Sequence, residues 1–399
     1  MKQSRWFGAV AAAALCFVAT PASGQMSEAR ALWVTRFDYD SEAKIARIME
    51  TAAKANFNIV YFQVRASGDA YYKSDIEPCA SRLCGKLGGT PKYDPLAVAV
   101  REGHKHGLQV HAYLNALTAK PAGIEGQCKP IPEPDARNPR HMLLKHPEWV
   151  MSDRRGKKLP CPNSEEYIWL SPSFPGVRSQ LARVAADVAR RYDVDGIHLD
   201  RIRYPGNAWS WDPVSKSGFG KDPDQHPVEW KAYRTGLVNS MVRETWDSVA
   251  AVKPNLVYSA AVWGIYDDIW KWKTLAGKTD LMQDYRAWAK DGYMDVLVPM
   301  TYSRIKEPCA RIDWGCMLDE QLGAEKETGR QMYIGIDASK GAREVVNQVR
   351  MARSRGATGM AIFSYSALAD TRAFQLLGST VFSEKASVPV MSWKVQASH

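Results

Sequence analysis

Residues 193–205 read DVDGIHLDRIRYP. A short apolar run is followed at once by an acid, two arginines, a tyrosine and a proline, which is typical of a strand that ends in a site. Because side chains alternate along a strand, we expect His198 and Asp200 on one face and Arg201 on the other. If this strand belongs to a closed parallel barrel, the site lies on the inward face at its carboxyl end.

Seven further apolar runs alternate with stretches of helical periodicity. The eight predicted strands are Ala31–Phe37, Asn58–Val64, Leu108–Leu114, Gly196–Arg201, Leu256–Trp263, Val296–Tyr302, Met332–Ile336 and Gly359–Tyr365. The predicted helices are Ser41–Ala55, Asp94–His106, Gly176–Tyr192, Pro227–Val252, Leu281–Asp291, Leu318–Thr328 and Ala342–Arg355. This alternation predicts an α/β fold, the (β/α)8 TIM barrel. A doubly wound open sheet usually has a glycine-rich turn after its first strand, and residues 36–40, RFDYD, have none.

Long segments follow the strands, at 65–93, 115–175, 202–226, 264–280 and 303–313. In a barrel they gather on the C-terminal face and wall a cleft. The cysteines of the mature chain fall in or beside these loops and are Cys79, Cys84, Cys128, Cys161, Cys309 and Cys316. Nearest-neighbour pairing gives disulfides Cys79–Cys84, Cys128–Cys161 and Cys309–Cys316, although six cysteines allow 15 pairings. A zinc cluster is the rival, but the chain has no CxxC pair and no HExxH, so we expect no metal.

Residues 1–24 have the features of a signal peptide. Lys2 and Arg5 precede an apolar stretch at 7–18, and small residues follow at 19–24. We therefore expect a periplasmic or secreted protein, the alternative being an N-terminal membrane anchor. Residues 25–380 should form the catalytic barrel. Residues 381–399 lack periodicity and should form a tail that is loosely packed or disordered.

The composition limits the class of partner. The chain of 399 residues is 45% hydrophobic and 24% charged, as in an ordinary globular protein, and no later apolar run is long enough to span a membrane. The formal charge of +10 is dispersed, and loss of Lys2 and Arg5 lowers it by two. Without a basic stripe, nucleic-acid binding is disfavoured, and an anionic or wall-associated polymer is a more natural partner. Neither a G-x-S-x-G elbow, a P-loop nor a dinucleotide fingerprint occurs, so no cofactor is expected.

Acidic residues at the strand ends are the first candidates for catalysis. Glycosidic cleavage needs one group to protonate the leaving oxygen and a second carboxylate as base or nucleophile. Asp200 is the leading candidate, as general acid or as an essential electrostatic partner, and an ion pair that only orders the rim is the alternative. Asp337, at the end of the seventh strand, and Glu77, in the loop after the second, are candidates for the second carboxylate. Asp337 could instead cap the helix that follows it.

Polar and aromatic side chains at the other strand ends favour a carbohydrate cleft. Sugars bind through forked donors and acceptors and through stacking on aromatic rings. The candidate substrate-binding residues are Gln63, Arg65, His111, Tyr113, Asn115, His198, Arg203, Trp263, Tyr302 and Tyr365. Trp263 is the best candidate for a stacking platform. A buried histidine such as His111 or His198 has a second interpretation, as a satisfied core residue.

Several motifs resemble the glycosyl-hydrolase-like family 10 proteins. They are RALWV at 30–34, FQVRASGDAYY at 62–72, YDPL at 93–96, HKHGLQVHAYLN at 104–115 and DGIHLD at 195–200. The resemblance spans roughly residues 30 to 365. It implies an exported or lipid-anchored bacterial TIM-barrel enzyme that hydrolyses glycosides, some members acting on cell-wall glycan, including strands stripped of peptide.

Carried over by motif, the cleft residues that the resemblance implies are Gln63, Arg65, Asp69, His111, Asn115 and Asp200. Many members have two consecutive acids at the end of the fourth strand, whereas Arg201 stands second here, so the motif does not supply a partner for Asp200. We expect an exported glycoside hydrolase of a bacterial polysaccharide, with peptidoglycan glycan strands as the leading substrate. A hydrolase of a secreted exopolysaccharide and a non-catalytic glycan-binding protein are the alternatives.

Overall fold

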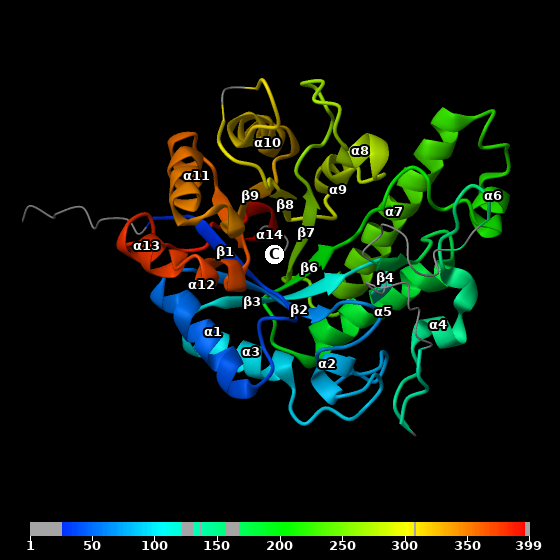
Figure 1. Ribbon diagram of the computed structural model, residues 1–399, viewed down its shortest axis with the longest axis horizontal. Coiled ribbons are helices and arrows are strands. Elements are labelled where there is room, and N and C mark those ends of the chain that lie inside the picture. Colours follow the sequence, from blue (N-terminus) through cyan, green and yellow to red (C-terminus); the bar gives the residue numbers. More distant parts are fainter. Residues whose placement is uncertain are drawn as a thin grey trace, which may run out of the picture.

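The computed structural model describes residues 26–121, 131–135, 137–156, 158, 167–306 and 309–395. Eight parallel strands close into a barrel in the order β1-β10-β9-β8-β7-β6-β3-β2, with helices around the ring (Figure 1). The strands are β1 Ala29–Val34, β2 Ile59–Arg65, β3 Gln109–Asn115, β6 Gly196–Asp200, β7 Val257–Trp263, β8 Val296–Met300, β9 Gln331–Asp337 and β10 Gly359–Phe363. Each corresponds to one of the eight predicted runs, and the TIM barrel is confirmed.

Seven helices correspond to the predicted ones. They are α1 Glu42–Lys54, α3 Pro95–Lys105, α5 Pro175–Arg191, α7 Pro227–Ala250, α9 Tyr285–Lys290, α10 Trp314–Thr328 and α11 Ala342–Ser354. Side-chain caps determine where several of these helices begin. At the start of α3, the Asp94 carboxylate accepts a hydrogen bond from the Ala97 amide. The Asp313 carboxylate accepts from the Cys316 amide at 2.8 Å, so α10 begins four residues earlier than the apolar pattern indicated.

Shorter elements decorate the barrel in the described part of the chain. The helices are α2 Ser81–Cys84, α4 Met142–Lys145, η1 Pro147–Trp149, α6 Pro213–Phe219, α8 Gly277–Asp280, η2 Ala338–Lys340, α12 Tyr365–Asp370, α13 Ala373–Ser379 and α14 Ser392–Val395. An antiparallel ribbon pairs β4 Thr118–Pro121 with β5 Tyr167–Trp169. Each of these segments has at most seven residues, fewer than the roughly 11 over which a hydrophobic pattern can be recognised. None of the described helices has the length and apolarity needed to cross a membrane.

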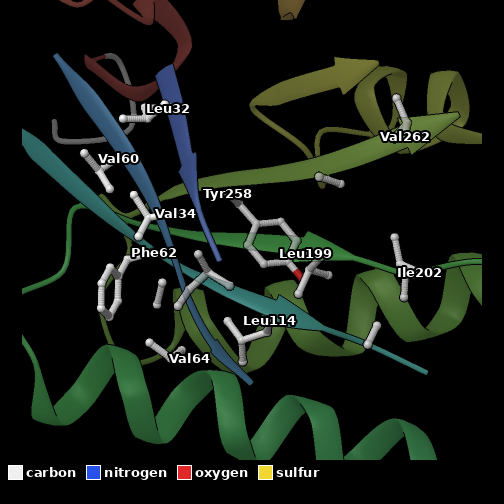
Figure 2. Close-up of a cluster of buried hydrophobic side chains, with 14 of the residues drawn as sticks. Leu32, Val34, Val60, Phe62, Val64, Leu114, Leu199, Ile202, Tyr258 and Val262 are labelled. Atoms are coloured by element: carbon white, nitrogen blue, oxygen red, sulfur yellow. The ribbon is translucent and has the colours of Figure 1, made fainter. Parts of the chain in front are cut away.

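The outward faces of the strands form the main core, between the barrel and its helices. Leu32 and Val34 of β1 and Phe62 of β2 are fully buried in this layer, part of which Figure 2 shows. The alternate residues of the same strands, Trp33 and Tyr61, point into the barrel. This period of two places every second side chain of each strand inside the ring, where the last residues face the C-terminal mouth.

His198 lies in the middle of the barrel interior. Its Nε2 accepts a hydrogen bond from Trp33 Nε1 at 3.1 Å, its Nδ1 lies 2.9 Å from Ser259 Oγ, and the Tyr61 ring stacks on it at 3.9 Å. His111 lies beside Tyr61 and is 1% exposed. Both rings lie in the core beneath the mouth, which favours the interpretation as core residues over the predicted contact with substrate. His198 has a partner at each ring nitrogen, whereas His111 has one, Gln109 Oε1, at 3.2 Å from its Nε2.

Burial lowers the pKa of His198 to about 3 and that of His111 to about 4. His198 is therefore neutral in the folded protein, whereas an unfolded histidine takes up a proton below a pH of about 6.5. Between these values the unfolded state binds the extra proton, so the stability that the neutral ring provides is present above this window and is lost as pH falls through it.

Replacing His198 with glutamine is expected to flatten this pH dependence. Glutamine can still accept from Trp33 and donate to Ser259, but it binds no proton. As the pH is lowered from 6.5 to 4, the free energy of unfolding should decrease less steeply in the variant than in the native protein. The two slopes should differ by about 1.4 kcal/mol per pH unit. Urea unfolding at several pH values measures the slope, with the exposed His106→Gln as the control. An unchanged slope in His198→Gln would contradict the assignment.

The C-terminal segment packs closely against the barrel. Phe382 is fully buried with its ring centroid 5.4 Å from that of Phe57, and the Ser387 amide donates to Met26 O at 2.9 Å. Trp393 Nε1 donates to Asp295 Oδ1 at 2.8 Å, and α14 lies near the middle of the ring in Figure 1. The expected loose packing is wrong for residues 381–395, because irregular backbone buries these rings without producing a regular hydrophobic period.

Two of the three predicted disulfides are confirmed. Cys79–Cys84 closes the loop after β2, and Cys309–Cys316 closes the loop after β8. Both loops follow the carboxyl ends of barrel strands, so the two disulfides lie on the face of the barrel that carries the mouth. Cys128, Cys161 and the predicted signal peptide at 1–24 lie outside the described residues.

Candidate active site

A cavity of about 410 Å³ opens at the C-terminal mouth of the barrel. Its lining residues come from the ends of seven strands and from the loops that follow them. They are Trp33, Thr35, Arg36, Phe37, Gln63, Tyr113, Asn115, Tyr167, Asp200, Arg201, Ala261, Met300, Tyr302, Phe363, Ser364 and Ser366. Five of the predicted site residues meet here: Gln63, Tyr113, Asn115, Asp200 and Tyr302.

Asp200 ends β6 and lies opposite Asn115 of β3 in the strand register. Its Oδ2 accepts from the Tyr113 hydroxyl at 2.8 Å, and its Oδ1 accepts from the Arg201 amide at 2.6 Å. Arg203 Nη1 lies 3.6 Å from Oδ1. The carboxylate is therefore fixed in orientation by partners on β3 and on the loop after β6, with a small part of it facing the cavity.

The electrostatic surroundings keep Asp200 ionised. Burial alone would raise its pKa, but the charges of Arg201 and Arg203 and the hydrogen bonds from Tyr113 and the Arg201 amide outweigh burial, so the pKa lies below its ordinary value. At neutral pH the group is a carboxylate that can stabilise positive charge, accept a proton or act as a nucleophile. This favours the expected role of electrostatic partner over that of general acid.

Arg201 lines the cavity, although strict alternation predicted it on the opposite face of the strand. The strand ends at Asp200, and Arg201 has a φ of 53°, in the left-handed region. This turn directs the side chain back to the mouth, where its guanidinium lies 5.2 Å from the Tyr167 ring centroid. The alternation rule fails here because it holds only while the backbone stays extended.

Tyr167 reaches the cavity on the β4–β5 ribbon. The sequence interpretation treated residues 115–175 as one loop and missed both this ribbon and Tyr167. The signal was present in the run YIWL at 167–170, which has high β-propensity. Its partner, TAKP at 118–121, is too short to be recognised without the pairing.

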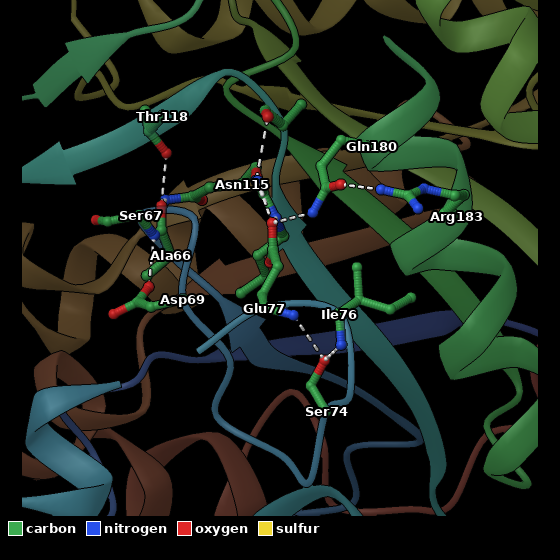
Figure 3. Close-up of polar contacts among 12 residues, drawn as sticks. Ala66, Ser67, Asp69, Ser74, Ile76, Glu77, Asn115, Thr118, Gln180 and Arg183 are labelled. Atoms are coloured by element: carbon green, nitrogen blue, oxygen red, sulfur yellow. Dashed lines mark hydrogen bonds and ion pairs between the residues drawn. The ribbon is translucent and has the colours of Figure 1, made fainter. Parts of the chain in front are cut away.

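Glu77 forms a buried ion pair with Arg65, and neither lines the cavity. Both side chains are 1% exposed; Arg65 Nε lies 2.8 Å from Glu77 Oε2, and Arg65 Nη2 lies 2.9 Å from Oε1. Gln180 of α5 also donates to Glu77, at 3.4 Å (Figure 3). In the structure the pair holds the loop after β2 against α5, which favours a structural role over the predicted catalytic role of Glu77 and the predicted substrate contact of Arg65.

Asp337 and Asp69 also lie outside the cavity lining. Asp337 caps η2 through the Ser339 amide at 2.9 Å and pairs with Lys340 at 3.2 Å. Burial and then the charges of Asp200 and Asp337 raise the pKa of the Tyr302 hydroxyl. Asp69 Oδ1 accepts from the Ser67 amide at 2.7 Å. Among the described lining residues Asp200 is thus the one carboxylate.

Arg203, Trp263 and Tyr365 surround the site without lining it. Arg203 is 5% exposed and supports Asp200 from behind, with its guanidinium 5.5 Å from the Trp263 ring centroid. Trp263 Nε1 donates to Leu275 O at 2.8 Å, which turns the ring toward the loop after β7. Tyr365 begins α12 and packs on Phe374. Their surroundings favour positioning and packing roles over the predicted contacts with substrate.

The remaining lining residues were not predicted. They are Trp33, Thr35, Arg36, Phe37, Tyr167, Arg201, Ala261, Met300, Phe363, Ser364 and Ser366. Most follow a strand by one to three residues, where the turn and not the strand decides the direction of the side chain. In the described ranges, His, Cys, Asp and Glu form no group of three that could hold a metal ion.

Relatives that are similar in sequence carry glycosyl hydrolase names. Glycosyl hydrolase YngK of Bacillus subtilis is 26% identical over 338 residues, which cover 78% of this chain and 61% of the relative. Glycosyl hydrolase DigH of Escherichia coli K12 is 24% identical over 346 residues, covering 79% of this chain and 75% of the relative. The chain thus spans less than two thirds of the Bacillus protein.

Solved structures show the same fold at low identity. The glycoside hydrolase domain of PgaB (BpsB) from Bordetella bronchiseptica has a TM-score of 0.63 at 14% identity, covering 88% of this chain and 98% of the domain. The catalytic domain of β-amylase from Paenibacillus polymyxa has a TM-score of 0.57 at 11% identity, covering 93% and 98%. These likenesses concern the fold alone.

The model of the family described as glycosyl hydrolase-like 10 matches residues 28–352. This range contains seven of the eight barrel strands and the motif that ends in Asp200. Since it covers most of the sequence, the chain belongs to the glycosyl hydrolase-like 10 family.

Proposed function

We propose that this protein is an exported glycoside hydrolase that cleaves a bacterial polysaccharide, with peptidoglycan glycan strands as its leading substrate. The observation that carries the proposal is Asp200, an ionised carboxylate that faces a cavity at the mouth of a TIM barrel. Its position at the carboxyl end of a barrel strand is where such enzymes hold catalytic groups. Family membership and relatives named as glycosyl hydrolases give further support.

The geometry suits stabilisation of a sugar cation. Positive charge develops on the sugar ring as a glycosidic bond breaks, and a fixed carboxylate lowers the energy of that state. Tyr113 and the Arg201 amide hold Asp200 in place, so no reorientation is needed during the reaction. Tyr302, Phe363 and Trp33 supply aromatic walls for the apolar faces of the sugar.

Export is part of the proposal. It is supported by the charged, apolar and small-residue pattern of residues 1–24 and by the disulfides Cys79–Cys84 and Cys309–Cys316. Disulfides persist in oxidising compartments such as the periplasm and the cell exterior. Fractionation of cells that express the full chain tests this part, and recovery of the protein in the cytosol with its N-terminus intact would contradict it.

Release of reducing ends tests the hydrolase. The purified protein is incubated with wall sacculi, with sacculi from which an amidase has removed the peptides, and with a secreted exopolysaccharide. We expect new reducing ends from the sacculi, and more after the peptides are removed. Cleavage of the exopolysaccharide alone would show that the substrate is a secreted exopolysaccharide and not peptidoglycan. Binding to the glycans without any new ends would overturn the proposal in favour of a glycan-binding protein.

A further inference from the structure

Five arginine side chains are buried in the described part of the chain, and they differ in what neutralises them. Arg30, Arg36, Arg65, Arg203 and Arg234 are each at most 9% exposed. A guanidinium removed from water needs a counter-charge or strong acceptors. Three have a carboxylate partner: Arg30 pairs with Glu28, Arg65 with Glu77 and Arg203 with Asp200. Arg234 donates to the Asn207 and Trp209 carbonyls at 3.1 Å.

Arg36 differs from Arg30, Arg65 and Arg203 because it has only neutral partners, and it differs from Arg234 because it lines the cavity. Its Nη1 donates to Gln63 Oε1 at 3.3 Å and its Nη2 to the Tyr167 hydroxyl at 2.9 Å. No carboxylate of the described residues lies within ion-pair distance of it. Asp69 is near enough to feel the charge of Arg36, but that carboxylate is bonded to the Ser67 amide. The charge of Arg36 is therefore left for a group inside the cavity.

The position of Arg36 is fixed before any ligand binds. Its backbone amide donates to the same Gln63 oxygen at 3.0 Å, and Gln63 Nε2 donates to Asn115 Oδ1 at 3.4 Å. Asn115 is in turn anchored to the Ala66 carbonyl at 3.1 Å. The Phe37 ring covers the guanidinium, with its centroid at 4.2 Å. A side chain held in this way loses little freedom when it binds a ligand.

We propose that Arg36 binds the carboxylate of an acidic sugar residue in this cavity, so that the protein selects carboxylate-bearing glycans over neutral ones. The inference rests on the proposed function and names the substrate class of the same site. The described hydrogen bonds use two of the five N–H groups of the side chain, and the others can form the forked contact that guanidinium makes with a carboxylate. The lactyl ether of muramic acid and the uronic acids both supply this group.

Binding of small sugars that the protein cannot hydrolyse tests the proposal. Dissociation constants are measured by NMR titration for N-acetylmuramic acid, its methyl ester and N-acetylglucosamine. Glucuronic acid and glucose form the second arm, which separates the two sources of carboxylate. We expect at least one of the two acids to bind about tenfold tighter than its neutral counterpart, the effect of hydrogen bonds to a charged group.

Variants of Arg36 assign the preference to this side chain. Arg36→Gln should bring the acid-to-neutral ratio close to one, whereas Arg36→Lys, which keeps the charge but not the fork, should give an intermediate ratio. The exposed Arg343→Gln on α11 is the matched control and should behave as the native protein. If Arg36→Gln does not fold, the acid-to-neutral binding ratios of the native protein and of Arg36→Lys still test the proposal.

Two results would overturn the inference: equal binding of acids and neutral sugars by the native protein, or a preference that survives in Arg36→Gln. Because these measurements involve no turnover, they are independent of the hydrolase assay. A clear preference for the acid in a protein that releases no reducing ends would remove the proposed hydrolysis and keep the carboxylate site. Cleavage of polysaccharide by a protein that shows no preference for the acid would keep the proposed hydrolysis and remove the carboxylate site.

Discussion

Replacing Asp200 with asparagine is expected to lower the rate of reducing-end release by at least about a thousandfold, since the fixed carboxylate is lost from the site of developing positive charge. The fold should survive. Asparagine keeps the shape of the side chain, its oxygen can accept from the Arg201 amide, and its NH2 group can donate to the Tyr113 hydroxyl, which both donates and accepts. Initial rates on peptide-free sacculi measure the effect, with circular dichroism as the check on folding.

Asp337→Asn is the matched control for Asp200→Asn. It is the same substitution at the end of another barrel strand, where the carboxylate caps η2 and pairs with Lys340 instead of lining the cavity. We expect it to retain activity within about tenfold of the native protein, because the loss of a cap costs about 1 kcal/mol of stability. Retained activity in Asp200→Asn would remove Asp200 from the mechanism. Equal loss in both variants would make Asp337 the second catalytic carboxylate after all.

Glu77→Gln is expected to lower the free energy of unfolding by about 3 kcal/mol, the largest stability effect that we predict for a single substitution. The change leaves the Arg65 guanidinium, which is 1% exposed, without its counter-charge. Removing one partner of a buried ion pair leaves an uncompensated charge, which costs far more than the loss of a surface pair. Urea unfolding measures the effect, and the specific activity of the folded fraction should remain unchanged.

Two comparisons separate a structural role of Glu77 from a catalytic one. Glu133→Gln breaks the exposed pair with Arg140 and should cost less than about 1 kcal/mol. The double variant Arg65→Met with Glu77→Leu replaces both charges by apolar groups and should recover part of the lost stability. A Glu77→Gln protein that is as stable as the native one but inactive would restore Glu77 as a candidate for catalysis.

The sequence alone determined the architecture and the position of the site along the chain. Period-two runs and helical stripes report local backbone geometry, so each of the eight strands was recognised from its own residues. The motif ending in Asp200 was recognised for the same reason, as an acid that follows a buried strand. The short spacing of Cys79 and Cys84 likewise allowed the pairing to be predicted from neighbouring positions.

Only the tertiary structure decided which polar groups face the cavity. Glu77 and Asp200 are both acids on the C-terminal side of barrel strands, but Glu77 pairs with Arg65 in the core, while Tyr113 and Arg203 hold Asp200 at the mouth. The direction of the Arg201 side chain into the cavity depends on the left-handed backbone conformation of that one residue. These outcomes depend on partners distant in the sequence and on the exit angle of the chain from each strand. Local periodicity contains no information on either, which is why Arg36 became a candidate ligand only in the folded molecule.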